Sequence, residues 1–136
     1  MKKFFQHTAY FIAYGIWWFL SLLPFWALYL LSDGLYLLMS HVVRYRHRVI
    51  WHNLRTSFPE KSEDELRQIE KNFYKWFCDY IVETVKLITM SKEQLLKRMT
   101  FTGVEKLNQY AAEGRSVGVY LGHLGNWEWI TSLPYW

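Results

Sequence analysis

Cysteine is scarce in this 136-residue sequence, and charge is missing near its start. Cys78 is the single cysteine, which excludes an internal disulfide framework and a zinc site built from several cysteines. Between Phe4 and Ser32 there is no Asp, Glu, Lys or Arg. Aromatic residues are abundant instead, at 20% of the chain. This composition excludes an intrinsically disordered protein, because disordered chains contain few aromatic residues.

The charge-free run from Phe4 to Ser32 predicts a segment embedded in a membrane. It is longer than the roughly 20 apolar residues that carry a helix across a bilayer core. Pro24 removes an amide donor and kinks a helix, so the run is either one kinked span or a segment that enters and returns on the same side. We expect the single span, a membrane anchor helix over residues 1–43. More cationic residues follow the run than precede it, so the positive-inside rule places the body on the cytoplasmic side.

A cluster of positive charge follows the predicted anchor. Arg44, Arg48 and Arg55 fall on one face of a regular helix, and apolar side chains gather elsewhere around it. A basic amphipathic helix of this kind binds the anionic headgroups of a membrane surface. A solvated basic face without a specific ligand is the plain alternative. Nucleic acid is not expected as a partner, because an anchor precedes the cluster and no recognition motif follows it.

Two capping boxes predict where the next helices begin. In Ser62–Glu65 the serine hydroxyl accepts from the glutamate amide while the carboxylate reaches back, and apolar residues follow at helical spacing as far as Ile88. Ser91–Gln94 opens a second, short helix. Residues 44–99 are therefore interpreted as a basic amphipathic helix followed by a long helix and a short one.

The pattern changes after residue 99 and predicts strands that alternate with helices. Thr100–Thr102 is β-prone, and the helical stretch Val104–Glu113 ends at Gly114 in the usual C-terminal position. Ser116–Leu121 is a short apolar run of strand length. This order indicates an α/β fold with a parallel sheet. We expect residues 100–136 to be the truncated start of an α/β domain.

The stretch GHLGNWE holds the residues with the clearest chemical potential. His123 follows a predicted strand, and Gly122 and Gly125 permit a tight turn. With Asn126 as the N-cap, Glu128 lies at the positive end of the next helix, where its ionised form is favoured. Such a carboxylate can accept a proton from one imidazole nitrogen and raise the basicity of the other, which makes a general base. The spacing alone is a weak signal, and a buried core histidine is the structural alternative.

The sequence GHLGNWEW closely resembles the signature of the bacterial late acyltransferases of lipid A biosynthesis, the lauroyl/myristoyl type. These enzymes belong to the wider H-x4-D/E acyltransferase group. The resemblance rests on residues 44–62, which include NLRTSFPEKS, and on residues 118–129. It implies an α/β acyltransferase-like fold behind an N-terminal transmembrane helix and a helical segment. Members of the family are longer, so we expect residues 1–136 to lack a C-terminal half and to be inactive alone.

The resemblance also implies a reaction. His123 would deprotonate a hydroxyl of a lipid A precursor, which then attacks the thioester of an acyl carrier protein, while Glu128 orients the imidazole. No cofactor and no metal are expected. The reaction would take place at the bacterial inner membrane, on its cytoplasmic side. Two alternatives stay open: transfer to another lipid, such as a lysophospholipid or an amino-acid lipid, and a non-catalytic module at the membrane surface.

Overall fold

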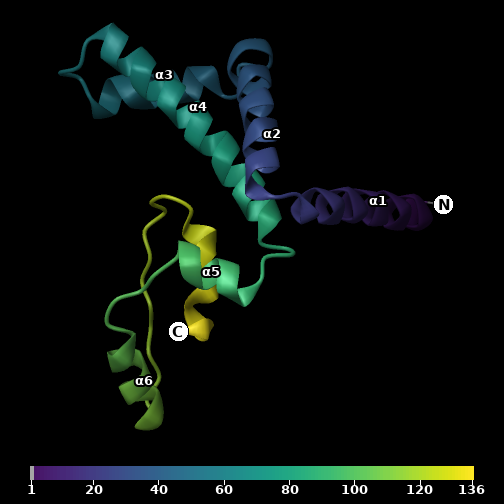
Figure 1. Ribbon diagram of the computed structural model, residues 1–136. Coiled ribbons are helices and arrows are strands. Elements are labelled where there is room, and N and C mark those ends of the chain that lie inside the picture. The colour runs from purple at the N-terminus through teal and green to yellow at the C-terminus, as the bar shows by residue number, and fades with distance from the viewer. Residues whose placement is uncertain (1) are drawn as a thin grey trace.

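The computed structural model describes residues 2–136, with side chains from Gln6 onward, and it is built from helices (Figure 1). The longest helix, α4, crosses the middle of the molecule, and α1 projects away from it toward the N-terminus (Figure 1). The division of the chain into residues 1–43, 44–99 and 100–136 stays a prediction. The helical elements, in chain order, are α1 (Lys2–Leu22), α2 (Phe25–Leu37), the π-helix η1 (Leu38–Val42), α3 (His47–Ser57), α4 (Glu63–Lys86), α5 (Lys92–Arg98), α6 (Val104–Ala112) and the 3-10 helix η2 (Trp127–Tyr135).

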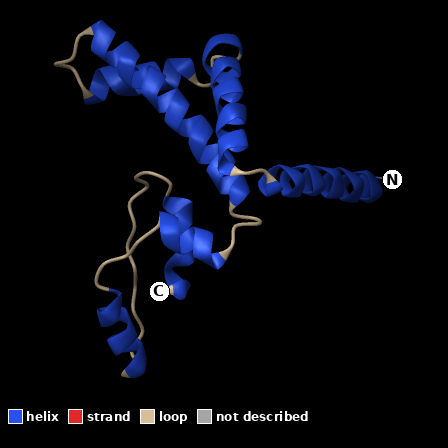
Figure 2. Cartoon of the chain, in the orientation of Figure 1, coloured by secondary structure: helices blue, strands red, loops and turns tan. Residues whose placement is uncertain are grey.

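The predicted α/β fold is wrong. Figure 2 shows no strand in residues 2–136, and the two segments expected to be strands, 100–102 and 116–121, are irregular. Tyr120, in the middle of the second segment, is 98% exposed. A strand is stable only when a neighbouring strand satisfies its backbone groups. Neither segment has such a neighbour within the described chain, so β-prone composition alone does not produce a sheet.

The predicted transmembrane helix over residues 1–43 is also wrong. Pro24 divides the run, because it has no amide hydrogen and is the N-cap residue of α2, so that α1 and α2 point in different directions (Figure 1). Within residues 2–136, no single helix is long and apolar enough to cross a membrane. One bent pair, Phe25–Val42 with His47–Ser57, meets the length and composition requirements together, with an angle of 87° between its parts.

Helix α4 carries the contacts that hold the other helices. It begins as predicted: the Glu65 amide donates to the Ser62 hydroxyl over 3.4 Å, and the Glu65 carboxylate accepts from the Ser62 amide over 2.9 Å. It packs most extensively against α2, and it also contacts α1, η1 and α3. The second capping box is also confirmed, at the start of α5. The buried apolar residues of the described chain are Leu28, Leu66, Tyr74, Cys78, Val82, Leu95 and Trp129.

A polar stripe on α4 faces α2. Asp79 and Glu83 are one helical turn apart, so they lie on the same side of the helix. The Ser32 hydroxyl donates to Asp79 Oδ1 over 2.6 Å, and the Tyr29 hydroxyl donates to Glu83 Oε1 over 2.9 Å. These bonds satisfy polar groups between two packed helices and fix their register.

Lys86, at the end of α4, closes the C-terminal end of α1. Its side chain is only 6% exposed, and its Nζ donates to the carbonyl oxygens of Ser21 and Leu23 over 2.8 and 2.9 Å. The last carbonyls of a helix have no partner within the helix, and they favour a cation. Burial lowers the pKa of Lys86. The lysine thus supplies donors at the break that Pro24 creates.

We expect Lys86→Met to lower the free energy of unfolding by about 1–3 kcal/mol, because it leaves the Leu23 carbonyl without its donor and the Ser21 carbonyl with Thr89 alone. Urea unfolding of the full chain in detergent, followed by circular dichroism, measures the change. Lys71→Met is the matched control, since Lys71 is exposed on the same helix. Equal stability of the two variants would show that Lys86 does not stabilise the junction of α1 and α2.

Candidate active site around the H-x4-E motif

The predicted site residues lie in the loop after α6 and in the first turn of η2. Gly122 and His123 are exposed in this loop, and Gly125 has a φ of 64°, in the left-handed region that favours glycine. Asn126 is the N-cap residue of η2, as predicted, which places Glu128 at the second position of the helix. The Asn126 side chain does not cap the helix, however, because it bonds elsewhere.

The structure does not join His123 to Glu128 directly. The His123 ring contacts the Trp127 ring edge-on, with 4.7 Å between the ring centroids. Glu128 Oε1 accepts a hydrogen bond of 3.0 Å from the Tyr80 hydroxyl of α4. Within residues 2–136 no hydrogen bond or ion pair connects the histidine to the glutamate. Their action as a catalytic pair therefore stays a prediction.

Two side chains of α4 hold the motif in place. Tyr80 binds Glu128, and Glu83 Oε2 accepts from the Asn126 amide nitrogen over 2.7 Å. The other oxygen of Glu83 accepts from Tyr29 of α2, so one carboxylate joins two helices and the motif. Sequence reasoning missed both α4 residues. Their signal was a tyrosine and a glutamate three positions apart, which places them on one face of the long helix.

Tyr29 and Tyr80 keep their hydroxyl protons, because each hydroxyl donates a hydrogen bond to a carboxylate. Burial raises the pKa of Tyr80, and its hydrogen bond to Glu128 raises it further. Burial also raises the pKa of Tyr29, with a further contribution from its hydrogen bond to Glu83. Both phenols therefore donate to their carboxylates throughout the neutral range.

Two hollows are lined by the α4 residues that hold the motif, one by Tyr80 and the other by Glu83. An apolar cavity of about 460 Å³ lies between α1, α2 and α4, and Tyr80 lines it. A second cavity of about 460 Å³ is lined by Glu83, Arg98, Met99, Asn126 and Trp129. The side-chain oxygen of Asn126 and the indole nitrogen of Trp129 are buried without a protein partner in the described chain. The other residues that line the apolar cavity are Trp17, Leu20, Leu28, Leu31, Leu35, Ile81, Val82, Thr84 and Val85.

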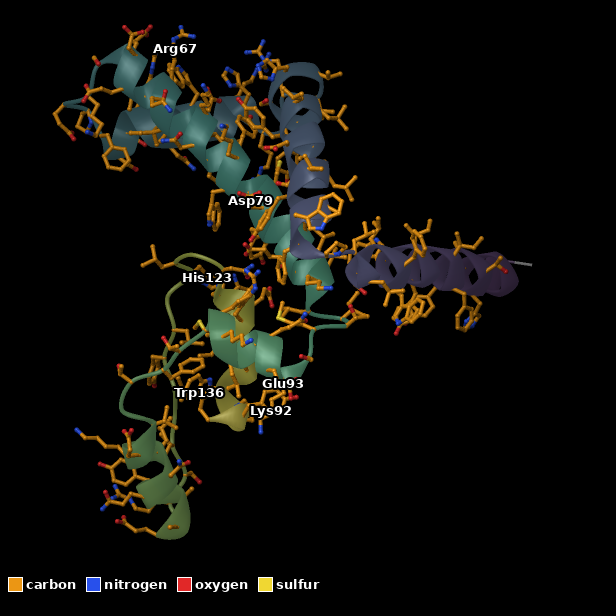
Figure 3. All side chains as sticks on the ribbon, viewed as in Figure 1. Arg67, Asp79, Lys92, Glu93, His123 and Trp136 are labelled. Carbon is orange, nitrogen blue, oxygen red and sulfur yellow. The ribbon has the colours of Figure 1, made fainter. Side chains whose placement is uncertain are left out.

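The predicted basic face is divided between a turn and a helix. Arg44 lies in the turn before α3, whereas Arg48 and Arg55 lie on α3, and all three are exposed. Arg55 pairs with Glu63 and lies over the Trp51 ring, 5.1 Å from its centroid. Helix α3 packs on α4, and Figure 3 shows Arg67 of α4 far from His123. The structure thus keeps the basic residues apart from the motif.

Comparison with known families identifies the chain. The family model described as bacterial lipid A biosynthesis acyltransferase matches residues 1–132. The chain belongs to this family of acyltransferases, which confirms the resemblance seen in its motifs. No curated protein and no solved structure matches the chain.

We expect Glu83→Ala to release the motif loop from α4, because it removes the acceptor of Asn126 and of Tyr29 together. Hydrogen–deuterium exchange of residues 122–130 measures the effect, and we expect exchange there to become at least about tenfold faster, the effect of about 1.4 kcal/mol. Glu60→Ala, at an exposed glutamate before α4, is the control. Unchanged exchange in Glu83→Ala would mean that other contacts hold the loop.

The raised pKa of Tyr80 predicts a loss of stability in alkali. The folded state holds the Tyr80 hydroxyl proton more tightly than the unfolded state. The contribution of this proton to the free energy of unfolding is therefore complete below the ordinary tyrosine pKa of about 10. It is lost as the pH rises through the higher folded-state pKa. Urea unfolding between about pH 8 and pH 11 therefore shows a steeper decline for the wild type than for Tyr80→Phe. Tyr120→Phe, at an exposed tyrosine, retains the wild-type slope; equal slopes for both variants would contradict the assignment.

Proposed function

We propose that the protein transfers a fatty acyl chain from an acyl carrier protein thioester to a hydroxyl of a lipid A precursor. The observation that carries this proposal is the double role of Tyr80. Its hydroxyl holds Glu128 of the motif, and its side chain lines the apolar cavity between α1, α2 and α4. An acyl chain in that cavity would contact Tyr80, the residue that binds Glu128. Family membership supplies the reaction class, acyl transfer.

In the proposed reaction His123 is the general base. One imidazole nitrogen takes the proton of the acceptor hydroxyl, whose oxygen attacks the thioester carbonyl carbon. The tetrahedral intermediate then collapses: the carbon–sulfur bond breaks, and the carrier thiolate takes the proton from the imidazolium. The products are the ester and the free carrier thiol. His123 is exposed, so an acceptor can reach it without the opening of a lid.

Glu128 stabilises the imidazolium in this mechanism. Its Oε1 is held by Tyr80, and no protein group within the described residues donates to its Oε2. That oxygen is available for the second nitrogen of His123, once the imidazole turns from its edge-on contact with Trp127. A carboxylate on that nitrogen selects the tautomer and raises the basicity of the other.

We place the reaction at the cytoplasmic side of the bacterial inner membrane. Residues 6–19 of α1 are exposed throughout and include Trp17, Trp18 and Phe19. A continuous exposed apolar surface is typical of a site that contacts a membrane or a partner protein. The exposed arginines of the turn and of α3 add attraction for anionic headgroups.

Two other functions compete with this proposal. The same base chemistry serves another lipid acceptor, such as a lysophospholipid or an amino-acid lipid. A non-catalytic membrane-surface module is favoured by a different observation, namely that Glu128 bonds to Tyr80 and not to His123. Under that reading the motif only fastens a loop to α4. An assay with several acceptors separates these functions.

We expect His123→Ala to lower kcat by about 10²–10⁴-fold, the usual contribution of a general base. Glu128→Ala should lower kcat in the same direction by a smaller factor, since it acts through the histidine. The assay uses the full-length protein and measures transfer from a labelled acyl carrier protein to a lipid A precursor, a lysophospholipid and an amino-acid lipid. His52→Ala is the control, because His52 is an exposed histidine of α3 outside the motif.

Undiminished transfer by His123→Ala would reject the proposed base. Transfer to a lysophospholipid or an amino-acid lipid alone would replace the acceptor and keep the mechanism. If the full-length wild type binds membranes but acylates none of the acceptors, the non-catalytic module is the correct interpretation.

A further inference from the structure

A second hollow lies between α3 and α4, away from the motif. This groove has a volume of about 430 Å³, within the usual size range of small-molecule sites, roughly 300–1,000 Å³. Its residues belong to the turn before α3, to α3 with Phe58, and to α4 as far as Phe77. None of them takes part in the contacts of His123 or Glu128. The proposed acyl transfer therefore does not use it.

The walls of the groove include aromatic rings that stack on one another. The rings of Tyr45 and Phe77 stack with 5.7 Å between centroids and 6° between planes. Phe73 also stacks on Phe77, with 5.8 Å between centroids and 10° between planes. Val49 and Phe58 remain 45% and 38% exposed, so the groove is open to solvent. Such a surface accommodates a flexible hydrocarbon chain.

One end of the groove is strongly basic. Arg46 and Val49 line both this groove and an adjoining hollow of about 630 Å³, whose other residues are Arg44, His47 and Arg48. No acidic residue lines either hollow. Three guanidinium groups within five positions offer a dense set of donors, in the fork geometry that matches phosphate oxygens.

The basic turn is held in an unusual conformation. Arg44 and Arg46 both have a φ of 50°, the positive-φ values that the described chain shows outside glycine. Non-glycine residues adopt this region at a cost, which the surroundings must offset. The Tyr74 hydroxyl donates to the Tyr45 carbonyl over 2.8 Å, and His47 Nδ1 lies 2.5 Å from Glu70 Oε1. Two contacts from α4 thus hold the turn in a fixed place beside the groove.

We propose that this groove binds one anionic phospholipid, with its phosphate on Arg44, Arg46 and Arg48 and one acyl chain between α3 and α4. The basic end of the groove matches the phosphate headgroup of such a lipid, and the adjoining apolar part, the trough, matches its acyl chain. An acidic protein such as an acyl carrier protein would engage the arginines but would leave the aromatic trough unused. Bound in this way, the lipid fastens α3 and the N-terminal half of α4 to the membrane surface, independently of catalysis at the motif.

Native mass spectrometry of the full chain in detergent, titrated with phosphatidylglycerol or phosphatidylcholine, tests this proposal. The wild type should retain one phosphatidylglycerol and bind phosphatidylcholine at least tenfold more weakly. Arg44→Asn with Arg46→Asn removes two charges but keeps residues that tolerate positive φ, and it should weaken phosphatidylglycerol retention at least tenfold. Lys97→Gln with Lys106→Gln, at two exposed lysines elsewhere, is the charge-matched control and should bind like the wild type.

The trough is tested separately. Asn53 lines the groove and its neighbour His52 does not, so Asn53→Trp should abolish retention while His52→Trp leaves it unchanged. Glycerol phosphate, which has no acyl chain, should not displace the lipid. Equal retention by the double asparagine variant, or displacement by glycerol phosphate, would overturn the proposal. The proposal would also be overturned if the variant with Arg44→Asn and Arg46→Asn lost binding of the acyl carrier protein but retained phosphatidylglycerol like the wild type. Far-ultraviolet circular dichroism confirms that each variant is folded.

Discussion

The rest of the site depends on the hydrogen bonds that the carboxylate of Glu83 accepts. A carboxylate between packed helices is costly unless donors satisfy both of its oxygens. Tyr29 of α2 satisfies one and Asn126 of the motif satisfies the other. One group therefore links α2 and the motif loop to the same helix, beside the separate bonds between Ser32 and Asp79 and between Tyr80 and Glu128. The apolar cavity that Tyr80 lines lies between α4 and these helices, α1 and α2.

Helix α4 separates two chemically different regions. Its C-terminal half carries the motif and, through Lys86, the end of α1. Its N-terminal half carries α3, the basic turn and the aromatic groove. Figure 3 shows this separation, with Arg67 at one end of the molecule and His123 near the other end of the helix. The proposed lipid groove and the proposed catalytic motif therefore lie on different halves of α4 and share no residue.

The sequence predicted the helices whose ends are determined locally. The capping box of Ser62 and Glu65 needs only four consecutive residues, and so does the capping box of Ser91 and Gln94. The strands were predicted wrongly, because a strand depends on a partner that no local pattern specifies. The transmembrane anchor was predicted from a lack of charge, but α1 and α2 are separate helices on the two sides of Pro24. The family was recognisable because its motif is a short contiguous stretch.

By itself the sequence determined the family, the start of α4 and the N-cap position of Asn126, since each depends on residues adjacent in the chain. Only the tertiary structure decided what Glu128 and Asn126 touch. Their partners, Tyr80 and Glu83, are 48 and 43 positions away in the chain. Contacts over such separations follow from how helices pack, and helix packing is set by many side chains acting together.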